Sequence, residues 1–205
     1  RTTAVPHRWD GRLSREIPAL ATELGTAAAA RGLPIDPILQ KAIEGSAKGV
    51  PADRAAAAMR LVVSQLDASH GALTGSAALA ADTVAIAAGA SALTAGLKDR
   101  DVAALSRSAA PAPDIIVGLR VAGTLVALGV PTTESVSLVQ ASLQAGRPAG
   151  ELLSLPGQVQ TQVAKGATPA QAAAGLARGA AAQSRRGPPP GRGQPPPHPG
   201  PPPHP

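Results

Sequence analysis

The chain has 205 residues and no cysteine, which excludes disulfides, thiol nucleophiles and cysteine-bound metal sites. Its formal net charge is +6, but residues 1–16 carry two of these charges and residues 185–205 carry three, so the body carries a single net positive charge. A body so near neutrality has no long-range field to steer a polyanion, and we expect no specific nucleic-acid partner.

The apolar residues, 44% of the chain, are unusually small. Phe and Tyr are absent, Trp9 and Met59 are the only residues of their kinds, and alanine supplies most of the apolar count. Aromatic side chains ordinarily bury the most area in a core. We therefore expect a core of Ala, Val, Leu and Ile, stabilised by close helix–helix approach and by self-association.

A recurring turn signal predicts the fold. The signal is a glycine followed by an aliphatic residue and then a proline, and it occurs at 32–34, 49–51 and 129–131. In looser form, with other residues between glycine and proline, it occurs at 146–148 and 166–169. Glycine closes a helix in the left-handed conformation, and proline suits the first position of the next helix. The sequence thus predicts an all-α fold of about eight or nine short antiparallel helices, joined by tight Gly-x-Pro turns in a bundle or a short array.

The chain divides into an N-terminal arm at 1–13, a helical domain at 14–184 and a Pro/Gly-rich tail at 185–205. In chain order the expected helices cover 14–30, 34–47, 51–69, 76–95, 99–108, 114–128, 131–145, a segment from 148 interrupted at 155–157, and 169–183. The glycines at 32 and 49, like those at 129 and 146, lie 17 residues apart. Helical-repeat duplication and similar capping of helices of similar length both explain this spacing.

The block 32–60, GLPIDPILQKAIEGSAKGVPADRAAAAMR, resembles a segment of uncharacterised alanine-rich bacterial proteins with Gly/Pro-rich C-termini. This resemblance implies no activity and no site.

The two ends of the chain suggest an extended C-terminal tail and a location outside the cytoplasm. Of the 19 residues at 187–205, 15 are Gly or Pro, a composition that favours polyproline II and a spacer or recognition ligand. The chain begins at Arg1 rather than Met. We expect a cleaved secretory signal, and hence a periplasmic or secreted protein, with a trimmed chain as the alternative.

Few residues suggest chemistry. Asp82 lies in the apolar stretch 77–96, where it can face solvent, pair with an arginine or line a pocket; a buried helix there is favoured over a transmembrane one. His70 is expected at a helix C-terminus, where it interacts with the dipole. The segment 45–49, GSAKG, looks superficially like a phosphate loop but falls at a helix end. We predict no catalytic, cofactor-binding or metal-binding residue, and the sequence assigns no small-molecule ligand.

The sequence favours a non-catalytic structural or protein-interaction module, with a protein partner or a second copy as its ligand. The alternative is a helix-turn-helix nucleic-acid-binding protein, because 44–60 and 124–139 each place a glycine in a tight turn between two helices. The helix after Pro131 has no basic residue in its first turns, and the helix after Pro51 has only Arg54 and Arg60. Both fit base recognition poorly.

Overall fold

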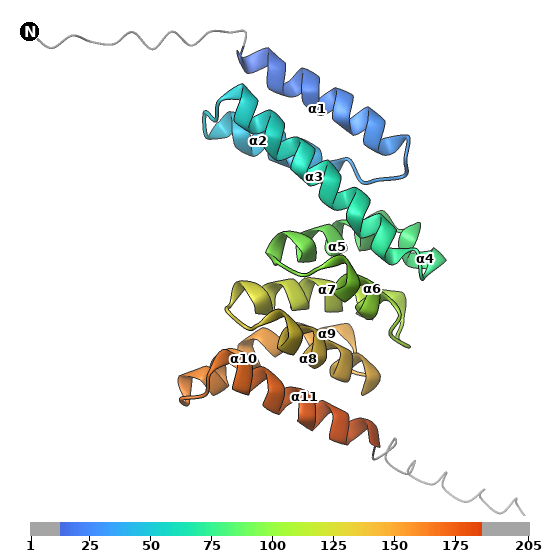
Figure 1. The fold of residues 1–205 in the computed structure, drawn as a ribbon, viewed down its shortest axis with the longest axis vertical. Coiled ribbons are helices and arrows are strands. Elements are labelled where there is room, and N and C mark those ends of the chain that lie inside the picture. Colours follow the sequence, from blue (N-terminus) through green and yellow to red (C-terminus); the bar gives the residue numbers. More distant parts are fainter. Residues whose placement is uncertain (1–12, 186–205) are drawn as a thin grey trace, which may run out of the picture.

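A computed structural model describes residues 13–185, and in this range every regular element is an α-helix (Figure 1). The helices are α1 (Leu13–Ala29), α2 (Asp36–Ala47), α3 (Ala52–Leu73), α4 (Ala77–Ala80), α5 (Thr83–Ala95), α6 (Asp99–Ser106), α7 (Ala112–Ala127), α8 (Thr132–Gln144), α9 (Ala149–Leu153), α10 (Leu155–Ala164) and α11 (Pro169–Arg185). The all-α prediction is confirmed. The expected arm and tail lie outside the described residues, apart from Leu13 and Arg185, which belong to α1 and α11.

The helices form an elongated array. They succeed one another in chain order along the long axis of the molecule, from α1 to α11 (Figure 1). Helices α1, α2 and α3 pack together, and the contacts then pass from α3 to α5, from α5 to α7, from α7 to α8 and from α8 to α11. Of the two arrangements that the sequence left open, the structure has the array.

Six glycines with positive φ end helices in this array. At each of them, the N–H groups of the glycine and of the next residue donate hydrogen bonds back to the last turn of the helix. At the end of α7, the Val130 N–H donates to the carbonyl of Leu125 at 3.0 Å and the Gly129 N–H donates to that of Val126 at 2.9 Å. This is the Schellman arrangement, which satisfies carbonyls that a helix end leaves free. The glycines are Gly32, Gly49, Gly96, Gly129, Gly146 and Gly166.

Five of these glycines belong to the predicted turns, and the left-handed conformations expected of Gly49 and Gly129 are confirmed, with φ values of 60° and 86°. The turn at Gly96 falls between the expected helices 76–95 and 99–108, although it lacks the full turn signal because Lys98, rather than proline, follows Leu97. Leu97 is nevertheless buried, as are Leu33 and Val130 in the equivalent position of their turns. A buried aliphatic residue after the glycine anchors the turn on the core.

Several helix boundaries differ from the prediction, and two of the differences each add a helix in the described part. The expected helix 76–95 and the segment from 148 each form two helices, and the second break falls at Ser154 rather than at 155–157. The first break arises because Asp82 ends α4 and caps α5. Helix α3 does not stop at residue 69 but continues through Gly71 to Leu73, whose side chain is buried in the core. Burial here outweighs the modest helical cost of one glycine.

Neighbouring helices approach closely through glycine and other small residues. A Cβ atom added to Gly123 of α7 would lie 3.3 Å from the Cα of Ala92 in α5, and one added to Gly118 would lie 3.0 Å from a methyl of Val139 in α8. Gly45 of α2 similarly faces the Cβ of Ala55 in α3 at 3.3 Å. Interfaces of this kind bring two helix backbones close enough to make many weak van der Waals contacts, without any aromatic side chain.

The turn glycines predict a stability difference. Replacing Gly129 with alanine should lower the free energy of unfolding by about 1 kcal/mol, because its Cβ would be strained at a φ of 86°. Gly179 of α11 is the matched control, since a Cβ there meets open space and alanine in a helix interior is more stable than glycine by about 1 kcal/mol. Denaturant unfolding of both variants measures the difference. Equal effects of the two substitutions would contradict the left-handed assignment.

The contact between α3 and α5 predicts energetic coupling. Gly89→Ala would place a Cβ 2.2 Å from Ser69 Oγ, which donates a buried 2.8 Å hydrogen bond to the carbonyl of Ile86. We expect a loss of about 1–3 kcal/mol of stability. In a Ser69→Ala background the obstructing oxygen is gone, so Gly89→Ala should cost at least about 0.5 kcal/mol less. A double-mutant cycle by denaturant unfolding tests this, and strictly additive effects would refute it.

Candidate functional site

Two surfaces of the described chain could bind a partner: an apolar stripe on α2 and a groove between α3 and α6. The α2 stripe consists of Ile35, Leu39 and Ile43, of which 40%, 37% and 67% of the surface is exposed. A spacing of four residues places them on one side of the helix. Two further aliphatic residues of α2, Ile38 and Ala42, are buried against the core. The stripe, which begins at the N-cap residue Ile35, is therefore additional apolar surface that the fold covers only in part.

Charges lie beside the α2 stripe rather than within it. The Lys41 ammonium donates a 2.8 Å hydrogen bond to Glu44. This bond and the attraction of the two charges lower the pKa of the Glu44 carboxyl below its ordinary value. Both groups are paired on the surface of the helix, and such exposed pairs contribute little to stability.

The α3–α6 groove has a volume of about 600 Å³. Small residues of α3 and of the turn after it form one side, and α6 with its C-terminal turn forms the other. The lining residues are Ala68, Gly71, Ala72, Thr74, Gly75, Asp99, Arg100, Ala103 and Arg107. The aliphatic part of Arg107 lies over Gly75, where a Cβ would be 3.6 Å from Arg107 Cγ. Backbone and methyl groups thus line much of the groove, and two guanidinium groups border it.

Asp82 is half-exposed, is not paired with an arginine among the described residues and does not line the α3–α6 groove; it caps a helix. Its Oδ1 accepts a hydrogen bond from the N–H of Val84 at 2.7 Å and a longer one from that of Ala85 at 3.3 Å. It is the N-cap of α5, with extended backbone. The sequence prediction placed Asp82 inside a helix because the flanking alanines suggested no interruption. The capping preference of aspartate explains the break.

The other residues singled out from the sequence have structural positions. His70 lies in the last turn of α3, as predicted. Residues 45–49 form the end of α2 and the turn into α3, with Gly45 buried against Ala55. His7, His198 and His204, like Trp9, lie outside the described residues.

The buried polar side chains within residues 15–185 are all serines: Ser69, Ser106, Ser135 and Ser142. Ser142 Oγ is buried without a hydrogen-bond partner, so no base is bonded to it. In the same part of the chain, no three His, Cys, Asp or Glu side chains are grouped to hold a metal ion. Across helices α1 to α11, none is both long and apolar enough to cross a membrane.

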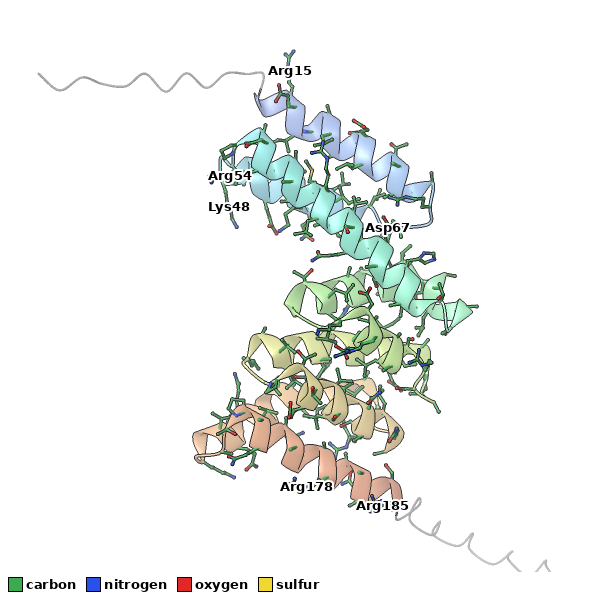
Figure 2. The ribbon with its side chains drawn as sticks, viewed as in Figure 1. Arg15, Lys48, Arg54, Asp67, Arg178 and Arg185 are labelled. Atoms are coloured by element: carbon green, nitrogen blue, oxygen red, sulfur yellow. The ribbon has the colours of Figure 1, made fainter. Side chains whose placement is uncertain are left out.

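The helix-turn-helix alternative gains no support from the geometry. There are two candidate recognition helices: α3, which packs against α1, α2, α5 and α6, and α8, which packs against α7 and α11 and also touches α6. Seven of the thirteen residues of α8 are buried, which leaves little of that helix free to enter a groove. Figure 2 shows Arg15, Lys48 and Arg54 near one end of the array, and Arg178 and Arg185 on α11 near the other. These basic side chains do not form one stripe.

Sequence reasoning missed both surfaces. Ile35, Leu39 and Ile43 have the spacing of a helical face, but Ile38 and Ala42 continue that face, so the pattern alone does not divide buried from exposed positions. The sequence alone predicts a solvated turn for the dense cluster of charges at 98–101. Asp101 does accept a 2.9 Å hydrogen bond from the Lys98 N–H there, but the residues of α3 opposite Arg100 and Arg107 are brought near only by the tertiary fold.

The capping role of Asp82 can be tested by substitution. Asp82→Ala should cost about 1 kcal/mol of stability, because the N–H groups of Val84 and Ala85 lose their acceptor. Asp82→Ser should retain most of the stability, since serine also caps helices. Thermal and denaturant unfolding compare the variants. A serine variant as unstable as the alanine variant would show that the carboxylate does something other than cap the helix.

Comparison with protein-family models, with curated proteins and with solved structures finds no match for this chain. Its function must therefore be argued from the surfaces described above.

Proposed function

We propose that this chain is a non-catalytic structural or protein-interaction module, and that it associates with a second copy of itself through the α2 stripe. The observation that carries the proposal is the exposure of three large aliphatic side chains in one row. Ile43 alone exposes 67% of its surface. Contiguous apolar surface on a protein is typical of an interaction site.

A second copy fits the stripe in chemistry. Ile35, Leu39 and Ile43 carry no charge, so two copies facing each other bring no like charges together within the row. Antiparallel packing of two such rows would place the Leu39 side chains near the centre and each Ile35 near the partner's Ile43. Such an isologous contact is the commonest arrangement in homodimers.

The small-residue core supports the same proposal. Each buried methyl or methylene contributes about 0.8 kcal/mol, and the chain has no aromatic core residue within 15–185 to add to this. Covering three more aliphatic side chains would stabilise the folded state through association. The helix-turn-helix alternative has less support, because one candidate recognition helix, α8, has neighbours on both sides and the other, α3, offers only Arg54 and Arg60 beside Asp53.

Mass in solution tests self-association. The apparent mass of the wild-type chain should rise with concentration in sedimentation or light scattering. Ile43→Glu should give the monomer mass over the same range, because a carboxylate would have to be buried at the contact. The fold should persist, since Ile43 is mostly exposed.

Leu61→Glu is the matched control, because Leu61 of α3 is 59% exposed and lies outside the stripe. It should self-associate like the wild type. A wild-type mass that does not change with concentration would contradict self-association, and an equal effect of both substitutions would contradict its location on α2.

A further inference from the structure

We propose that the α3–α6 groove binds a short acidic segment of a partner protein, with carboxylates held by Arg100 and Arg107. This inference rests on the proposed role as an interaction module and assigns it a second surface with a ligand of defined chemistry. The groove and the α2 stripe lie on different helices, so each can be tested without altering the other.

The small residues of the groove leave room for an extended backbone. The groove has a volume of about 600 Å³ and is open to solvent. Gly71 and Gly75 on the α3 side have no side chain, and Ala68, Ala72 and Ala103 contribute only methyl groups. A peptide can therefore approach the backbone of α3 closely and place an aliphatic side chain against these methyl groups.

The charges of the groove favour acidic residues in that peptide. Two of the lining residues are arginines and one, Asp99, is acidic. Arg107 has no ion-pair partner within residues 13–185. Arg100 has only a marginal one, since its Nε lies 3.8 Å from Asp101 Oδ1 and its side chain is 78% exposed. A planar guanidinium can bind a carboxylate through two parallel hydrogen bonds.

Arg107 is better placed for recognition than an arginine on a free surface. The stem of Arg107 packs over Gly75, and the two arginines lie at opposite ends of α6, one in its first turn and one just after its last residue. They are seven residues apart, which is about 10 Å along a helix. Two acidic side chains that flank one residue of an extended segment lie on the same face, about 7 Å apart, and the long side chains of the two arginines can span the remaining distance.

The experiment uses an immobilised array of pentapeptides. Each peptide has Asp or Glu at its second and fourth positions and Ala, Val, Leu or Ile at the others, and each is paired with its Asn or Gln counterpart. The wild-type chain should bind the acidic members of the strongest pairs at least tenfold more tightly than their amide counterparts. Binding should weaken as salt is added, because the contacts are between charges.

Two substitutions test the groove in different ways: one removes a guanidinium group that borders it, and the other fills it. Arg107→Gln should weaken binding to the selected acidic peptides at least tenfold. Gly71→Leu should fill the groove and abolish binding, although it should fold normally, since a Cβ at Gly71 meets no atom within 4 Å. The matched controls on α11, Arg178→Gln and Gly179→Leu, should bind like the wild type, because both residues lie far along the array from α6 (Figure 1, Figure 2). Unfolding curves confirm that each variant is folded.

Equal binding of acidic and amide peptides, absence of binding to any acidic peptide, or retained binding by folded Gly71→Leu would overturn the groove proposal. Self-association of the same samples separates this result from the fate of the proposed function. If no acidic peptide binds but Ile43-dependent self-association is intact, only the groove proposal is contradicted. If the peptides bind but the chain does not self-associate, only the proposed α2 contact is contradicted.

Discussion

Close approach of helix backbones is the constraint on which the rest of this structure depends. With no Phe, Tyr or Cys in the chain, the core cannot rely on large rings or on cross-links. Gly45, Gly89, Gly118 and Gly123 lie where a Cβ would come within 3.4 Å of a neighbouring helix. The helices are therefore held by many short-range contacts between small groups, and each such contact weakens steeply when helices separate. Packing of this kind tolerates little added volume at the contact and much at the outer faces.

The turns impose the second constraint, because they decide where each helix can point. In six of them a left-handed glycine reverses the chain, and the residue after it returns to the helix that has just ended through a backbone hydrogen bond. Polar contacts between helices also help to fix how the helices are oriented. Asp114 of α7 accepts a 2.8 Å hydrogen bond from the Ala149 N–H at the start of α9, and Arg31, after α1, is paired with Asp67 of α3 at 2.6 Å. The array is specified by local chemistry at its joints.

Local chemistry is also what made much of the fold predictable from sequence. Five of the glycine turns, the all-α class and most helix ranges followed from glycine and proline positions. The break at Asp82 did not, because an aspartate among alanines looks the same as an exposed helical residue until its partners are known. The α2 stripe and the α3–α6 groove were also beyond reach, since exposure of Ile43 and the contact of Gly75 with Arg107 depend on how separate helices stack. Residues far apart in the chain carried no signal of their proximity.

The linear order of contacts has a consequence for how the molecule opens. Because each helix of the array touches chiefly its near neighbours, stability is distributed as a series of local interfaces along one continuous hydrophobic core. Helices in the middle, such as α5 and α7, can exchange their amide hydrogens only when interfaces on both sides are broken, whereas α11 borders the array on one side. Amide protection should therefore be greatest in the middle and decline toward the ends, and partial unfolding should proceed inward by whole helices.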